Sequence, residues 1–136
     1  MSEINRLVEN SLDDVFVLTN NISAKCIKNS FAVINMTELS NFSDGLGLAT
    51  CLDTARSLIK AVIPRTTKAY LVWDLEWMYK PHDFNKVSKV FNSDLKIIVR
   101  SSNHAQVIEN LFGRKTDMVL RHFSLKEILH ELCPSI

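Results

Sequence analysis

Apolar and polar positions near the start of the chain predict two strands. Residues 15–19 (VFVLT) and 31–37 (FAVINMT) are short runs rich in Val, Ile and Phe, which favour extended backbone. Turn-forming Asn and Ser residues follow the first run. Residues 25–30 fit an extension of either strand. We therefore expect the two strands to form an antiparallel hairpin whose loop the pattern does not define.

Over residues 48–62, the spacing of the apolar residues changes to the period of an α-helix. Apolar side chains at steps of 4, 3, 4 and 3 residues trace one face of an α-helix: Leu48, Leu52, Ala55, Ile59 and Val62. Either Ser43 or Asp44, in the polar and glycine-containing segment 41–47, is expected to cap the start of this helix. The helix should stop before Pro64, which has no backbone N–H to continue it.

After Pro64, strands and helices alternate. Three runs are β-branched, aromatic or continuously apolar: residues 69–75 (AYLVWDL), 95–99 (LKIIV) and 118–120, the last extending to 123. Near-continuous apolar runs predict strands that are buried on both faces. Between them, residues 81–91 and 103–112 carry apolar side chains at helical spacing, which predicts two helices.

The ends of the later helices carry their own signals. Gly113 follows the helix predicted over 103–112, at the position where a left-handed residue commonly ends a helix. Ser124 and Glu127 form an S-x-x-E capping box at the start of a closing helix, and Pro134 is expected to end it. Right-handed crossovers should place the three later strands parallel in one sheet.

This order of elements predicts an α/β fold in which a β-hairpin edge is followed by α-β-α-β-α-β-α, with a mixed sheet covered by amphipathic helices. The chain has 136 residues, of which 46% are apolar and 23% are charged. Those values suit a single domain over residues 1–136, with a core at about residues 13–133. Neither a linker nor an internal repeat divides the sequence.

Charge and cysteine content exclude several classes of protein. The net charge is +1 and no block of like charges occurs, so neither nucleic acid nor an anionic membrane is an expected partner. No run approaches the roughly 18 apolar residues of a membrane span, and no signal-peptide pattern is visible at the start. The three scattered cysteines contain no C-x-x-C pair, which indicates reduced thiols and a cytoplasmic protein.

Two stretches resemble a known family. Residues 94–113 (DLKIIVRSSNHAQVIENLFG) and 117–132 (DMVLRHFSLKEILHEL) are similar to the strand, helix, strand and closing helix of STAS domains, the sulfate-transporter and anti-sigma-factor-antagonist family. The succession of elements over residues 13–133 resembles above all the divergent branch related to lipid-transfer CRAL-TRIO domains in bacterial proteins. The resemblance implies a STAS-like scaffold that acts through regulatory protein–protein contacts and has no enzymatic activity.

One departure from the family pattern changes this expectation. Regulatory STAS proteins carry a phosphorylatable serine in an aspartate-serine-x-glycine element between the third strand and the second helix. The corresponding residues 74–84 (DLEWMYKPHDF) contain neither serine nor threonine. We therefore do not expect a serine kinase to control which partner this chain binds.

The same segment has the most unusual composition in the chain. Two Trp, one Tyr and three carboxylates gather within residues 73–83, directly after a predicted parallel strand, where α/β proteins place their ligands. The residues predicted to bind a partner or ligand are Trp77, Met78, Tyr79, His82 and Lys86. The alternative is that Trp73 and either Trp77 or Met78 pack beneath the following helix.

Two kinds of occupant fit these residues. The first is a protein partner, with a homodimer as one form of it, and a module of this kind would expose part of Trp77, Met78 and Tyr79. The alternative is an apolar small molecule or lipid, in which case the same side chains would cover a pocket of roughly 300 Å³ or more between sheet and helices.

Other candidate sites have simpler explanations. Ser101, Ser102 and Asn103 form a strand-to-helix turn that is a candidate anion site, but capping by Ser102 or Asn103 is the simpler explanation, because helix starts prefer these residue types. No metal site is expected, since His130 and Cys133 supply only two ligands on one helix face. No cofactor motif and no nucleophile with a neighbouring base is evident, so neither a cofactor nor an enzyme is predicted.

Overall fold

Four parallel strands form the main sheet in this computed structural model, which describes residues 16–19, 32–42, 44–78 and 83–133. They are β3 (Gly45–Ala49), β4 (Thr66–Val72), β5 (Lys96–Val99) and β6 (Met118–Val119), side by side in that order. The helices that follow them are α2 (Leu52–Lys60), α3 (Phe84–Phe91), α4 (Ser102–Phe112) and α5 (Leu125–Leu132). The alternation predicted after Pro64 is confirmed, and so is the parallel arrangement of the last three strands.

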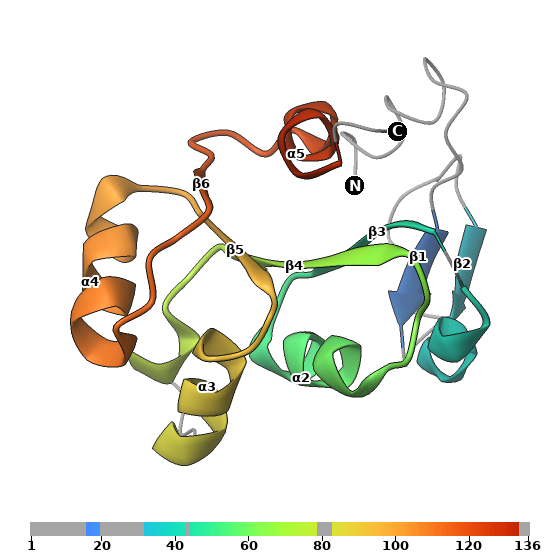
Figure 1. Cartoon of the computed structure of the whole chain (residues 1–136), viewed down its shortest axis with the longest axis horizontal. Helices are drawn as coiled ribbons and strands as arrows, with labels where there is room; N and C mark the ends of the chain where they lie inside the picture. The colour runs from blue at the N-terminus through green and yellow to red at the C-terminus, as the bar shows by residue number, and fades with distance from the viewer. Residues whose placement is uncertain (1–15, 20–31, 43, 79–82, 134–136) are drawn as a thin grey trace.

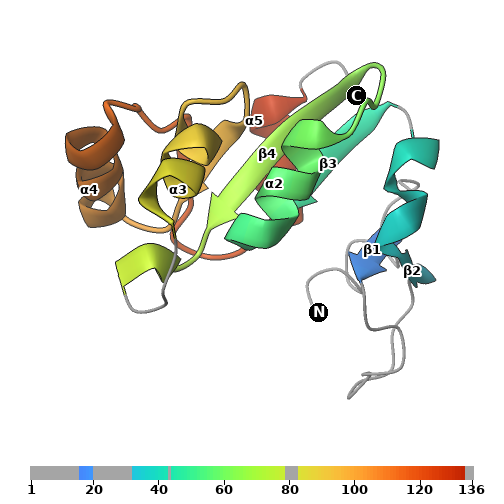
Figure 2. The same ribbon diagram turned by 90° about the horizontal axis from the view of Figure 1, so that it is seen from below.

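The helices cover the two faces of the sheet unequally. Helices α2, α3 and α4 lie on one face, and α5 lies on the other (Figure 1, Figure 2). Each of the first three connects neighbouring parallel strands that are added in one direction, so right-handed crossovers return them all to the same face. Helix α5 follows β6 and leads to no further strand among the described residues, so this constraint does not apply to it.

Each face of the sheet has its own apolar core. Side chains alternate between the faces along a strand, so Tyr70 and Val72 of β4 point toward α2 and α3, while Ala69 and Leu71 point toward α5. The core beneath α5 consists of Ala69, Leu71, Ile98, Leu120 and Ile128, all nearly inaccessible to solvent. The central strands are therefore apolar on both faces, as their continuous apolar runs predicted.

The first two strands pair differently from the prediction. Strands β1 (Phe16–Thr19) and β2 (Ala32–Asn35) confirm two strands near the expected positions, but they pair in parallel as a separate two-stranded sheet. The predicted antiparallel hairpin is wrong. The mixed sheet is not confirmed either, because every strand pair among the described residues is parallel. About a dozen residues separate β1 from β2, which is the length that a parallel crossover requires.

A strand also lies where the first long helix was expected to begin. Helix α2 begins at Leu52, because residues 45–49 form β3 instead, with Leu48 paired to Ala69 of β4. Gly47 permits close packing of this strand on α2, since a Cβ there would stand only 3.0 Å from Cδ1 of Leu58. Pairing with β4 thus overrides the helical period of the side chains at this point.

The caps predicted for this helix are corrected as well. Cys51 precedes the first turn of α2, and its backbone N–H donates to the Thr54 hydroxyl at 3.1 Å. Asp44 instead adopts a φ of 64° before β3, and its Oδ1 accepts a hydrogen bond from Nε of Arg65 at 2.6 Å. This hydrogen bond and the negative charge of Asp44 raise the pKa of Arg65. Ser43 lies outside the described residues.

The later helices begin and end close to their sequence signals. The Ser124 hydroxyl accepts a hydrogen bond from the backbone N–H of Glu127 at 3.3 Å, which confirms the predicted cap of α5. Gly113 ends α4 with a φ of 66°, as predicted. Asp83 caps α3 by accepting from the backbone N–H of Asn85 at 2.9 Å. Pro134 lies outside the described residues.

Candidate interaction surface

Four aromatic rings meet where η2 (Glu76–Met78), α3 and α4 come together. Phe112, at the end of α4, stacks on Phe91 and Phe84 of α3, with ring centroids 4.7 and 5.4 Å apart. Trp77 meets Phe91 and Phe112 edge to face, at 5.2 and 5.5 Å. Stacked and edge-to-face pairs at such distances add stability beyond the apolar area that they bury. We call Trp77, Phe84, Phe91 and Phe112 the aromatic cluster.

One side of the aromatic cluster is buried and the other is exposed. Phe91 is fully buried against Tyr70 of β4, at a centroid distance of 6.0 Å. Phe84 is 54% exposed, and two neighbours of the cluster in the chain, Met78 and Leu111, are 64% and 47% exposed. We call Met78, Phe84 and Leu111 the apolar rim. The helical periods placed Phe84 and Leu111 on the apolar faces of their helices, which gave no sign that solvent reaches them.

Glu76 fixes the position of η2 against α2. Its Oε1 accepts hydrogen bonds from the backbone N–H of Leu52 at 3.2 Å and from the Tyr70 hydroxyl at 3.4 Å. Leu52 begins α2, where unpaired backbone N–H groups favour a carboxylate. This contact joins residues 24 positions apart and holds the segment that carries Trp77 and Met78. The sequence contains no local signal for it.

A second exposed feature lies at the carboxyl ends of β4 and β5. The guanidinium carbon of Arg100 stands 4.7 Å from the centroid of the Trp73 ring, and Nη1 of Arg100 is 3.9 Å from Oδ1 of Asp74. Trp73 is 40% exposed, and both charged side chains are also well exposed. Exposed contacts of these two kinds each contribute at most about 1 kcal/mol. The contacts among Trp73, Asp74 and Arg100 therefore stabilise this part of the surface only weakly.

The structure separates the residues predicted to bind a partner. Met78 and Lys86 are exposed, whereas Trp77 is half-buried in the aromatic cluster against α3. Tyr79 and His82 lie outside the described residues. The alternative, in which Trp73 and either Trp77 or Met78 pack beneath α3, holds for Trp77 and is wrong for Trp73, which is 40% exposed.

The Trp77 ring is held by apolar contacts alone. Its Nε1 is buried without a hydrogen-bond partner, and so is Nδ1 of His104 in the first turn of α4. An unpaired buried donor costs about 1–3 kcal/mol. The ring contacts of Trp77 must offset that cost.

Among Ser101, Ser102 and Asn103, the residue that caps α4 is Ser101. The hydroxyl of Ser101 accepts a hydrogen bond from the backbone N–H of His104 at 3.2 Å, so Ser101 caps α4. Capping was expected from Ser102 or Asn103, and both are instead exposed in the first helical turn. Ser101 makes the cap because its backbone is still extended, as an N-cap residue requires. Residue type alone does not distinguish Ser101 from Ser102 and Asn103, since all three types are common caps.

A small hollow lies between α2 and α3. It measures about 30 Å³ and is lined by Leu52, Asp53, Arg56, Asp83, Lys86 and Val87. Four of these side chains are charged, and the volume admits about one water molecule. The hollow therefore differs from the apolar pocket of about 300 Å³ that the ligand-carrier alternative requires. Within the described part of the chain, no three potential metal ligands gather.

The chain was compared with models of protein families, with curated proteins and with solved structures, and none of them matches it. The surface is therefore interpreted from its own geometry. No helix among the described residues is long and apolar enough to cross a bilayer.

Proposed function

We propose that the chain is a regulatory protein-interaction module without enzymatic activity, and that a protein partner binds to the apolar rim. The observation that carries this proposal is the exposure of Met78, Phe84 and Leu111 beside an ordered set of packed aromatic rings. Large apolar side chains at interfaces supply most of the binding energy when they enter a pocket of the partner.

The surroundings of the apolar rim also suit an interface. The stack of Phe84 on Phe112 holds an exposed ring in one orientation, which reduces the entropy lost when a partner immobilises it.

Membership of the STAS family stays a prediction, and the proposal rests on the apolar rim instead. What the resemblance contributes is the expectation that a scaffold of this kind works through protein contacts. The lack of Ser and Thr in residues 74–84 implies that such contacts are not switched by a serine kinase at this segment.

The proposal is tested by comparing three forms of the protein as bait in a lysate of the cells that make it. The forms are the unaltered protein, Met78→Ser and Val62→Ser. Val62 is the matched control, because it is 86% exposed and lies in the connection between α2 and β4, away from the apolar rim. Proteins retained by each form are quantified by mass spectrometry, and the Kd of each purified partner is then measured by calorimetry.

We expect Met78→Ser to weaken binding of a partner about ten-fold, the usual effect of truncating an interface anchor. Val62→Ser should leave the Kd unchanged, and both variants should keep the melting temperature of the unaltered protein because both side chains are exposed. A partner that binds Met78→Ser as tightly as the unaltered protein would show that the apolar rim is not its binding surface.

A further inference from the structure

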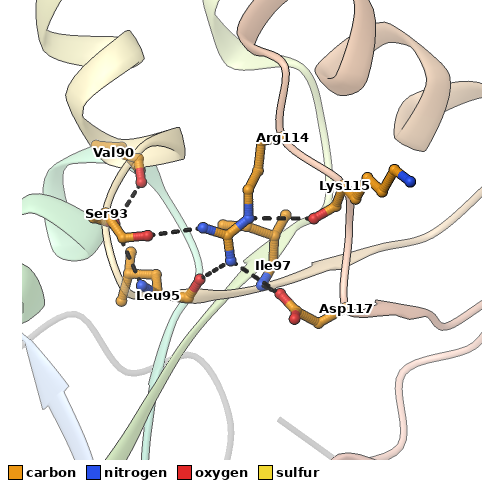
Figure 3. A network of polar contacts seen from close by, with 7 residues as sticks. All are labelled: Val90, Ser93, Leu95, Ile97, Arg114, Lys115 and Asp117. Atoms are coloured by element: carbon orange, nitrogen blue, oxygen red, sulfur yellow. Dashed lines mark hydrogen bonds and ion pairs between the residues drawn. The ribbon is translucent and has the colours of Figure 1, made fainter.

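Arg114 and Asp117 join three parts of the chain at the amino-terminal edge of the sheet (Figure 3). Nη1 of Arg114 donates to the carbonyl of Ser93 at 2.8 Å, and Nη2 donates to the carbonyl of Leu95 at 2.6 Å. Nη2 also donates to Oδ2 of Asp117 at 3.1 Å. The same carboxylate oxygen accepts the backbone N–H of Ile97 at 2.8 Å. The two side chains are mostly shielded, with 23% and 28% of their surface exposed.

The position of these contacts matters because β6 is the shortest strand of the sheet. It has two residues, Met118 and Val119, that pair with β5, and the backbone N–H of Leu120 donates to the carbonyl of Val99 at 2.7 Å just after it. The Asp117 carboxylate acts as an additional acceptor for β5 before β6 begins, and the backbone N–H of Asp117 donates to the carbonyl of Ile97 at 2.8 Å. Side chains therefore supply part of the attachment that a longer strand would obtain from its own backbone.

The segment that follows β6 packs on one face of the sheet. Ile128 of α5 is fully buried in the core that contains Leu71 and Ile98, and Leu132 packs against the same core. Among the described elements, α5 is the one helix on that face (Figure 1). The other face carries three helices, each tied to the sheet by strands at both of its ends. Among the described elements of this sheet, β6 has the fewest paired residues, and α5 is joined to a described strand at one of its ends.

We propose that residues 117–133, which we call the strap, open and close as one unit on the folded sheet, and that Arg114 and Asp117 are its latch. Opening breaks the β5–β6 pairing and lifts α5 from Leu71 and Ile98. The latch opposes this opening, because releasing the strap leaves the Arg114 guanidinium without its carboxylate and the Ile97 N–H without its acceptor. Partial opening of edge elements below the free energy of global unfolding is a common property of folded proteins.

Hydrogen exchange of the full chain tests the strap. In Arg114→Ala, the backbone amides of residues 118–133 and that of Ile97, which loses its acceptor on opening, should exchange about ten-fold faster than in the unaltered protein, while those of β4 keep their rates within about three-fold. Arg65→Ala is the matched control. It also removes an arginine–aspartate pair before a strand of the same sheet, but Asp44 and Arg65 directly precede β3 and β4, and the pair joins those two strands instead of the strap.

Labelling of thiols gives a second readout. Cys133, at the end of α5, is buried, whereas Cys51 before α2 is half-buried and lies outside the strap. Arg114→Ala should accelerate labelling of Cys133 about ten-fold and leave the labelling rate of Cys51 unchanged. Arg114→Lys retains the charge but not the two-sided contact, and it should give a smaller acceleration in the same direction.

Two results would overturn the proposal. If Arg114→Ala accelerates exchange equally in the strap and in β4, the strap opens only when the whole molecule unfolds. If it accelerates neither, Arg114 and Asp117 do not hold the strap. If Arg114→Ala does not fold, hydrogen exchange of the unaltered protein is measured in low concentrations of urea instead. The opening free energy of the strap amides must then depend less on urea than that of the β4 amides, because a local opening exposes less surface than global unfolding.

Discussion

Trp77 shows how neighbouring residues of one segment divide between packing and recognition. The sequence placed Trp77 and Met78 together as anchors for a partner, since both belong to the aromatic-rich stretch after β4. In the structure, Trp77 faces inward onto Phe91 and Phe112, and Met78 faces solvent. The difference arises from η2, whose position Glu76 fixes through its contact with the start of α2.

We therefore expect Trp77→Ala to lower the free energy of unfolding by about 1–3 kcal/mol, because it removes ring contacts and leaves a cavity. Trp77→Phe should change it by less than about 1 kcal/mol, because a ring is kept and the unpaired buried Nε1 is lost. Urea unfolding followed by circular dichroism measures both. A Trp77→Ala variant as stable as the unaltered protein would instead place Trp77 on the surface.

At the scale of elements, capping side chains decide where the later helices begin. Ser101 and Ser124 each accept a backbone N–H from the first helical turn, and Asp83 does the same for α3. Because such contacts join residues three or fewer positions apart, the sequence identified Ser124 correctly, although it expected Ser102 or Asn103 in place of Ser101. The start of α2 also differs from the prediction, because residues 45–49 pair with β4 as β3.

Ser101→Ala should destabilise the protein by about 1 kcal/mol, since the backbone N–H of His104 loses its acceptor. Ser102→Ala, one residue further on and exposed, should change stability by less than about 0.5 kcal/mol. Equilibrium unfolding in urea separates the two variants. Equal effects of both substitutions would mean that Ser101 is not the residue that caps α4.

At the scale of the whole molecule, the central strands hold the two cores together. Ile98 of β5 is fully buried beneath α5, while Ile97, the preceding residue, is fully buried on the opposite face. A cavity beneath α5 therefore weakens the sheet itself as well as the attachment of the strap. Val119 of β6 is 44% exposed at the edge and belongs to neither core.

We expect Ile98→Ala to cost about 2–5 kcal/mol through lost burial and the cavity left behind. Val119→Ala should cost less than about 1 kcal/mol, because solvent already reaches much of that side chain. Thermal and urea unfolding measure both effects. A loss for Val119→Ala as large as that for Ile98→Ala would indicate that β6 is packed far more tightly than its exposure implies.

Features that depend on residues close together in the chain could be predicted from the amino-acid sequence. The apolar runs identified β4 and β5, the helical periods identified α3 and α4, and the turn chemistry at Gly113 and Ser124 identified helix ends. Each of these signals lies within about one or two turns of chain, so local propensity and side-chain period are enough to recognise it.

Contacts between distant residues were decided only by the tertiary structure. The parallel pairing of β1 with β2 and the strand at residues 45–49 depend on a partner strand, which an apolar run does not name. The ring of Phe84 stacks on Phe112 at the end of α4, a contact that the period of α3 does not reveal. Arg114 and Asp117 bond to residues about 20 positions earlier in the chain, and no local pattern indicates those contacts. The periodicity of a helix says which side is apolar, but only the packing of the other elements determines how far that side is covered.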